Sequence, residues 1–197
     1  GTQRTSRLGG NGSLSAFYDF NGYNSINSSI NFRGFGFDVN GTTNGKINDV
    51  ISDNFTRTNK GNNFFGGYDW NTDYTRKFEK REGQELSLGV QYSRQNNDQD
   101  FTIKEVHDIE LLNRDTKVLN DGVNHETTLQ IDYVHPFNKA VKLETGAKAV
   151  IRNIISDYNT QNFDIATGYT PLIEKFNYDQ DVYAGYGSIN FLIAKKY

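Results

Sequence analysis

"TLQIDYVHPFNKAVKLETGAKAVI", residues 128–151, contains two alternating segments on either side of a turn with a proline. The apolar positions are Leu129, Ile131 and Tyr133 before the turn, then Val141, Leu143, Ala147, Ala149 and Ile151 after it. The positions between them carry mainly polar or charged residues, namely Gln130, Asp132, Lys142, Glu144, Lys148 and, just after the quotation, Arg152. Successive side chains of a strand point to opposite faces. The stretch therefore predicts two strands with one apolar and one charged face, as in a soluble sheet or in a wall between lipid and water.

The composition restricts the possible classes of protein. Among the 197 residues, only 35% are hydrophobic, but 14% are aromatic, which argues against a disordered chain. The net charge of −3 gives no support to nucleic-acid binding. Cysteine is absent, which excludes disulfides and thiolate metal sites. The sequence contains no run of 18 apolar residues, so it predicts no membrane-spanning helix. The strands of a membrane barrel carry a weaker signal, which is a segment of about 10 residues with alternating hydrophobicity.

The rest of the chain also predicts strands, seven in all. We expect them at residues 6–20, 25–39 and 62–78, around 86–93, in the two halves of the quotation, and at 176–193. The apolar parity of the second strand shifts near Gly34, from Ile30 and Phe32 to Phe35 and Phe37, which predicts a β-bulge. Within residues 104–119, a spacing of three between apolar residues predicts a short helical turn.

The connections alternate between short and long. The short ones are "NGYN", "EKREGQ" and "HPFNKA", and the long polar ones are residues 40–60, 95–124 and 156–174. A transmembrane β-barrel has this order, with short periplasmic turns and long extracellular loops. Because bacterial single-chain barrels use even strand numbers, seven strands predict an arc of a larger barrel.

Aromatic residues gather at the predicted strand ends, as the interfacial girdles of a barrel require. Near the short turns they are Tyr18, Phe20, Tyr23, Tyr74, Phe78, Tyr133 and Phe137. At the far ends they are Phe64, Phe65, Tyr92, Tyr158, Phe176 and Tyr178. The apolar face would then meet lipid, and all backbone groups would be satisfied only in a closed barrel.

The polar face is the candidate site, and we expect it to line a lumen. Its residues are Asp69, Asn71, Asp73, Gln130, Asp132, Lys142, Glu144, Lys148 and Arg152. Two interpretations stay open: an ion-pair ladder that holds the barrel shape, or a polar pathway for a solute. The sequence contains no recognisable catalytic constellation, and we expect no enzyme, no cofactor and no metal site.

Several motifs resemble the outer-membrane β-barrel of TonB-dependent-receptor-like proteins. They are "QIDYVHPF", "KLETGAKA" and "EKFNYDQDVYAGYGSINF", together with the upstream hairpin "DYTRKFEKREGQELSLGVQYSRQNND". The matching positions are Asp132, Tyr133, Pro136, Leu143, Glu144, Gly146, Lys148, Phe176, Tyr178, Tyr183, Ala184 and Tyr186. The family implies a barrel of about 22 strands with a plugged lumen. Neither a plug nor a TonB box is visible here, and we expect a turn into a further strand near Tyr197.

The resemblance implies a function and a location. Residues 1–197 would be part of one barrel domain in the outer membrane of a Gram-negative bacterium, contributing to passage or uptake of a nutrient. The expected partners are outer-membrane lipid, the TonB system acting through a plug, and a surface lipoprotein or other envelope subunit, with no nucleic acid. The alternatives are a barrel that scaffolds an envelope complex without transport, and a secreted soluble β-sandwich that binds glycans or surfaces.

Overall fold

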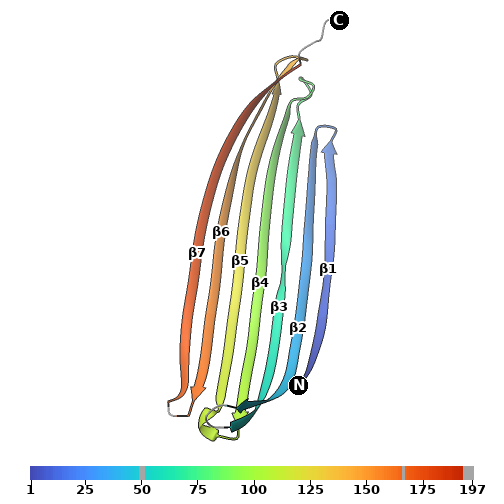
Figure 1. The fold of residues 1–197 in the computed structure, drawn as a ribbon. Coiled ribbons are helices and arrows are strands. Elements are labelled where there is room, and N and C mark those ends of the chain that lie inside the picture. Colours follow the sequence, from blue (N-terminus) through green and yellow to red (C-terminus); the bar gives the residue numbers. More distant parts are fainter. Residues whose placement is uncertain (49–51, 166, 193–197) are drawn as a thin grey trace, which may run out of the picture.

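The structure is a computed structural model that describes residues 1–48, 52–165 and 167–192. It consists of one seven-stranded antiparallel sheet in which each strand pairs with the next along the chain (Figure 1). The elements are β1 (Thr2–Asn21), β2 (Asn24–Asn48), β3 (Ser52–Lys77), β4 (Glu85–His107), the 3₁₀ helix η1 (Glu110–Leu112), β5 (Arg114–Pro136), β6 (Val141–Asp164) and β7 (Gly168–Phe191). The prediction of seven sequential antiparallel strands is confirmed.

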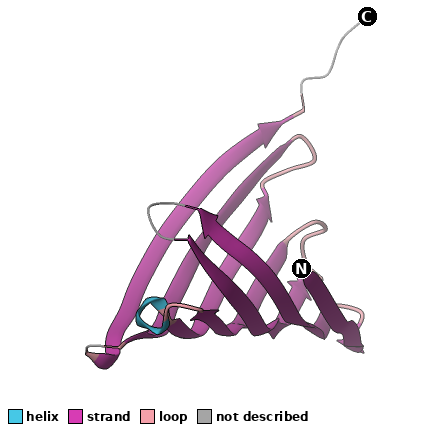
Figure 2. Ribbon diagram, turned by 60° about the horizontal axis from the view of Figure 1, so that its bottom comes forward, coloured by secondary structure: helices cyan, strands magenta, loops and turns pink. Residues whose placement is uncertain are grey.

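The sheet is bent into an open arc, and its two edge strands are β1 and β7 (Figure 2). No helix in the described part of the chain has both the length and the apolar character needed to span a membrane. At one end of the sheet lie the three short turns, which we call the turn end. At the other end lie the connections β2–β3, β4–β5 and β6–β7, which we call the hairpin end.

The strands are much longer than expected, and the three predicted long loops are mostly strand. Residues 40–48 and 52–60 belong to β2 and β3, residues 95–107 and 114–124 to β4 and β5, and residues 156–164 and 168–174 to β6 and β7. These segments are rich in Asn, Asp and Thr and so have no apolar alternation. They are strands because backbone hydrogen bonds to the neighbouring strands do not depend on side-chain polarity. The predicted helical turn is confirmed as η1, and Ile193 and Tyr197 lie outside the described residues.

The predicted bulge at Gly34 is wrong. Gly34 pairs with Gly10 of β1 and with Gly66 of β3, and the register is continuous on both sides of it. Phe32 and Phe35 therefore lie on opposite faces of β2. The apolar residues change from one face of β2 to the other while the backbone stays regular. The change therefore reflects different surroundings of the two faces along the strand.

Register and burial define the two faces of the sheet. Residues directly opposite each other on neighbouring strands project to the same face. By this criterion, every buried residue of the described chain lies on one face, and these residues are Asp53, Gly61, Glu105, Thr128 and Thr160. Bending a sheet crowds the side chains of its inner surface, so we call this the concave face and the other the outer face.

The sheet has a single layer. The described residues contain no buried hydrophobic side chain, and most of the large exposed apolar ones lie on the outer face. A soluble β-sandwich buries one apolar sheet face against a second sheet. The described chain provides only one sheet, so the β-sandwich alternative does not fit this fold.

Candidate functional site

The outer face carries an apolar band next to the turn end. Register joins Tyr74, Leu88, Ile131 and Ala147 into one transverse row of outer-face residues. The neighbouring row toward the hairpin end contains Ala16, Val90, Leu129 and Ala149. The next row contains Leu14, Ile30, Trp70, Tyr92 and Ile151. Along β5, the band covers outer positions from residue 127 to about residue 135, close to the roughly 9–11 residues with which a tilted strand crosses a bilayer.

Aromatic side chains mark the hairpin-end limit of this band. The rings of Phe32 and Tyr68 have centroids 6.3 Å apart, and those of Tyr68 and Tyr92 are 5.9 Å apart. In the same transverse row as Phe32 and Tyr68, Arg94 and His125 begin a polar zone. Amphipathic rings at such a boundary suit the headgroup level of a membrane.

The predicted far girdle was only partly right. Tyr92 lies in the boundary just described, and Phe64 lies on the outer face beyond it. Four other predicted members lie on the concave face, because their register partners are concave-face residues: Phe65, Tyr158, Phe176 and Tyr178. The prediction used only the position of each ring along its strand, and it grouped consecutive residues such as Phe64 and Phe65, which project to opposite faces.

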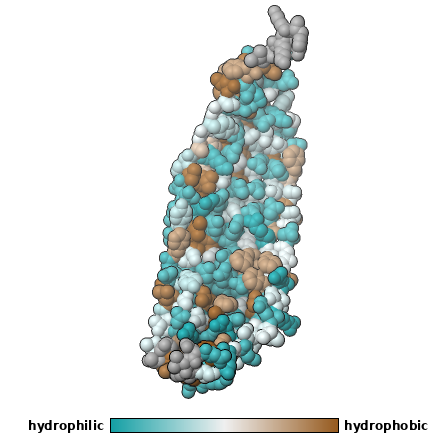
Figure 3. All heavy atoms as spheres, viewed as in Figure 1, coloured by the Kyte–Doolittle hydropathy of each residue, from teal (hydrophilic) through white to brown (hydrophobic). Residues whose placement is uncertain are grey.

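All nine predicted candidate residues lie on the concave face. Asp73, Gln130 and Lys148 occupy one transverse row through their pairing with Gly89 and with each other. Asp69 and Arg152 occupy another row, which also contains Ser93 and Glu126. The remaining members, Asn71, Asp132, Lys142 and Glu144, lie on the same face in further rows. The face of the sheet turned to the viewer in Figure 3 is mainly hydrophilic. That the concave face lines a lumen stays a prediction.

Within this polar face, two pairs of charged residues join neighbouring strands. Arg152 binds Oε2 of Glu126 with its Nε at 2.8 Å and Nη2 at 2.5 Å. Arg33 approaches Asp69 with a distance of 3.2 Å between Nη1 and Oδ2, and Ser93 donates to the other carboxylate oxygen of Asp69 at 2.6 Å. The pairs are only partly screened from solvent. They therefore fix side-chain positions more than they add stability.

Asp132, Lys142 and Glu144 make the other contacts of this face. Asp132 accepts hydrogen bonds from Gln130 Nε2 at 2.7 Å and from the Tyr186 hydroxyl at 2.7 Å. Lys142 and Glu144 form an ion pair along β6, with 2.6 Å between Nζ and Oε1. Lys148 forms no ion pair with the residues that the structure describes. A face with both signs of charge, mostly paired, provides a polar surface without a strong net field.

Sequence analysis missed Glu126 and Arg33 as members of this face. The signal for Glu126 was present in the turn. Pairing begins at Pro136 and Lys142, and counting back equally along β5 and forward along β6 places Glu126 opposite Arg152. For Arg33 the signal was also present, because it follows Phe32 and so alternates with the apolar positions Ile30 and Phe32.

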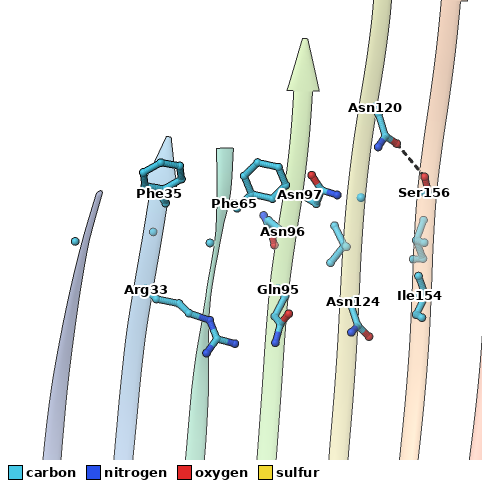
Figure 4. Close-up of a pocket in the computed structure, with 16 residues that line it drawn as sticks. Arg33, Phe35, Phe65, Gln95, Asn96, Asn97, Asn120, Asn124, Ile154 and Ser156 are labelled. Carbon is cyan, nitrogen blue, oxygen red and sulfur yellow. Dashed lines mark hydrogen bonds between the residues drawn. The ribbon is translucent and has the colours of Figure 1, made fainter. Parts of the chain in front are cut away.

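A cavity of about 590 Å³ lies on the concave face beyond the apolar band, toward the hairpin end (Figure 4). Phe35 and Phe65 line it from β2 and β3. Side-chain amides line it from β4 and β5, namely Gln95, Asn97, Asn120 and Asn124. Its volume is in the range of small-molecule sites, roughly 300–1,000 Å³.

A buried cluster lies at the hairpin end of the concave face. His107 Nδ1 and Asp53 Oδ2 are 2.6 Å apart, and the backbone N–H of Ile109 donates to Asp53 Oδ1 at 3.1 Å. Arg57 binds Glu105 beside them. Burial by itself would raise the pKa of Asp53, but the hydrogen bonds from His107 and the Ile109 backbone hold that pKa below its ordinary value. The cluster attaches the β4–β5 connection to the start of β3.

A curved antiparallel sheet with an apolar band on its outer face and a polar concave face defines the wall of a membrane β-barrel. The model of the outer membrane protein beta-barrel family matches residues 76–197, and the chain belongs to this family. The family places the chain in the outer membrane of a Gram-negative bacterium. In the structure the sheet is not closed.

No curated protein matches the chain. Among solved structures, the ferric yersiniabactin uptake receptor FyuA from Yersinia pestis is similar with 10% identity and a TM-score of 0.32, over 87% of this chain and 35% of that chain. The translocator domain of the autotransporter NalP from Neisseria meningitidis is similar with 5% identity and a TM-score of 0.16, over 96% of this chain and 81% of that chain. The chain thus spans about a third of the length of the FyuA chain that it matches.

Proposed function

We propose that residues 1–197 form part of the wall of a single TonB-dependent-receptor-like barrel domain that takes up a nutrient across the outer membrane. The observation that carries the proposal is the concave face. Its paired charges and amides cross from β2 to β7 at the level of the apolar band, where the opposite face meets lipid. Polar side chains at that depth need water or one another, and an aqueous lumen supplies the water.

The motifs around Asp132, Gly146 and Tyr186 support the same family, because the three residues form one contact in the structure. In this proposal the lumen is gated by a plug that acts with the TonB system, and the hairpin end receives the solute or a surface lipoprotein. The edges of β1 and β7 pair with further strands, because a barrel in hydrocarbon leaves no backbone edge unpaired.

A deletion of the full gene tests this function. Accumulation of a panel of labelled nutrients is measured in the deletion strain, with and without the wild-type gene, and with a protonophore added to remove the energy that TonB uses. We expect the loss of at least one nutrient, its recovery by the wild-type gene and its loss again with the protonophore. Unchanged accumulation of every nutrient, together with loss of an envelope complex, would instead show the non-transporting scaffold.

A further inference from the structure

Three phenylalanines on the concave face form a continuous aromatic surface, which we call the phenylalanine shelf: Phe35, Phe37 and Phe65. The rings of Phe37 and Phe65 are stacked, with centroids 6.1 Å apart and an interplanar angle of 13°. The Phe35 and Phe37 centroids are 5.9 Å apart. Phe35 is 44% and Phe65 37% exposed, so their rings are available for contact. No second layer of the described chain covers them on this face.

Hydrogen-bonding amides lie beside the shelf, on the neighbouring strands that line the same cavity (Figure 4). They are Gln95 and Asn97 of β4 and Asn120 and Asn124 of β5, and we call them the amide group. Asn120 Oδ1 accepts a hydrogen bond from Ser156 at 2.9 Å. Oδ1 of Asn124 is buried and receives no hydrogen bond from the described chain. A buried acceptor without a donor is costly, and a hydroxyl group bound in the cavity would satisfy this one once the Asn124 side chain turns toward the cavity that it lines.

The cavity is close to electrically neutral. Arg33 is the charged residue among those that line it, and its guanidinium is already engaged by Asp69 at 3.2 Å. A side-chain amide can donate and accept hydrogen bonds at the same time, and so can a hydroxyl group. The amide group therefore suits a ligand that carries several hydroxyl groups. An anionic solute would need a surplus of cationic side chains that this lining does not provide.

We propose that the phenylalanine shelf and the amide group bind a neutral oligosaccharide. A pyranose ring presents apolar C–H groups on its faces and hydroxyls around its edge. The C–H groups carry partial positive charge and pack on the negative faces of aromatic rings, and the hydroxyls match the amides. The inference rests on the proposed function for its setting, since it places the sugar in the lumen at the hairpin end of the apolar band.

Binding to the natural full-length protein, purified in detergent, tests the inference. Titration calorimetry is run with maltohexaose, cellohexaose, laminarihexaose and mannohexaose, and with a sulfated heparin hexasaccharide as the anionic comparison. We expect saturable binding of at least one neutral sugar and none of the sulfated one. Absence of binding by all four neutral sugars, or preference for the sulfated one, would overturn the inference.

The variants Phe65→Ala and Phe64→Ala form a matched pair, because these neighbouring residues lie on opposite faces of β3. Phe65→Ala should weaken binding by about tenfold, the upper range for loss of one aromatic contact, and Phe64→Ala should leave it unchanged. Asn124→Ala removes the orphaned acceptor without adding bulk and should also weaken binding. Equal affinities for wild type, Phe65→Ala and Asn124→Ala, all with folded barrel on heat-modified gels, would show that the sugar binds elsewhere.

The two proposals fail in different ways. If the full protein transports a nutrient but binds none of the neutral sugars, the oligosaccharide inference falls and the transport function stands. If the sugar binds at the shelf but the deletion strain accumulates every nutrient normally, the binding site stands and the transport function falls.

Discussion

The hydroxyl of Tyr186 on β7 donates a hydrogen bond to Oδ1 of Asp132 on β5 at 2.7 Å, across the intervening strand β6. It can do so because Gly146 lies beneath the ring. A Cβ at position 146 would lie 2.4 Å from both Asp132 Oδ1 and Tyr186 Cε1, and 2.8 Å from the backbone oxygen of Ile131. The close contact with backbone cannot be relieved by a side-chain rotation alone. The missing side chain of Gly146 is therefore what allows three strands to be joined on the concave face.

Gly146→Ala should reduce the stability of the barrel, by about 1–3 kcal/mol as for other overpacked sites. Tyr186→Phe keeps the ring and removes only the hydrogen bond, so its loss should be about 1 kcal/mol. Gly187→Ala is the control, since a Cβ there meets nothing within 4 Å. Urea unfolding in detergent, followed by the heat-modified gel shift, gives the three values. A Gly146→Ala variant as stable as Gly187→Ala would contradict the packing described here.

The pair of Arg152 and Glu126 should contribute little to stability. The two side chains are 38% and 29% exposed, and partly exposed pairs are typically worth about 0.2–1 kcal/mol. A double-mutant cycle with Arg152→Ala, Glu126→Ala and the double variant, measured by the same urea unfolding, should give a coupling energy in that range. A coupling energy of several kcal/mol would mean that the concave face is far drier than a water-filled lumen.

The sequence predicted the faces well where one face is apolar and poorly elsewhere. In residues 128–151 alternation separates Ile131 from Asp132 correctly, because lipid selects one parity throughout that segment. Beyond the band both faces carry polar residues. The sequence there has no apolar alternation from which to predict the lengths of β2 and β3 or the face on which Phe35 lies. The shelf was missed for this reason: its aromatic residues face inward where those of the membrane zone face outward. Contacts that join distant strands, such as that of Tyr186, require a register that only the assembled sheet supplies.

The hairpin end should face the outside of the cell, so that residues 40–60, 95–124 and 156–174 are all extracellular. The chain contains no cysteine, so single substitutions give unique labels. Asn48→Cys, Leu111→Cys and Ile165→Cys are exposed positions near the three hairpin tips, and Lys80→Cys is an exposed position at the turn end. A membrane-impermeant maleimide should label the first three on intact cells and Lys80→Cys only after lysis. Labelling of one hairpin without its neighbours would rule out this topology.

The attachment of η1 through Asp53 should weaken in acid. Because the folded pKa of Asp53 is lowered, its carboxylate stabilises the hairpin above the unfolded pKa of about 3.9, and this contribution is lost as pH falls through the lower folded value. A spin label at Leu111→Cys should therefore gain mobility below about pH 4. Glu105 also has a lowered pKa and faces the same cluster, so variants must separate the two carboxylates.

Asp53→Asn should make that spin label mobile already at pH 7. Asp108→Asn is the control, because an amide oxygen can still accept the hydrogen bond that Asn54 donates to this exposed residue. If Asp53→Asn keeps the label as immobile at pH 7 as the control does, the buried contact with His107 does not hold the hairpin.

The two faces of β4 provide a direct test of which face meets lipid. Leu88 lies on the outer face opposite Tyr74 and Ile131, and Ser87 lies on the concave face opposite Asp132. Leu88→Arg places a charge in hydrocarbon and should cost roughly 2–4 kcal/mol near the midplane of the bilayer. Ser87→Arg introduces the same side chain where water and the Asp132 carboxylate can accommodate it, and should assemble nearly as well as wild type.

Leu88→Phe tests whether lipid or a protein core meets the outer face, because acyl chains adapt to added bulk whereas a packed core rejects it at about 1–3 kcal/mol. The fraction of heat-modifiable barrel in isolated outer membranes should be close to wild type for Ser87→Arg and Leu88→Phe and should fall sharply for Leu88→Arg. The reverse order for the two arginine variants would exchange the faces, and failure of Leu88→Phe would mean that protein packs against the outer face.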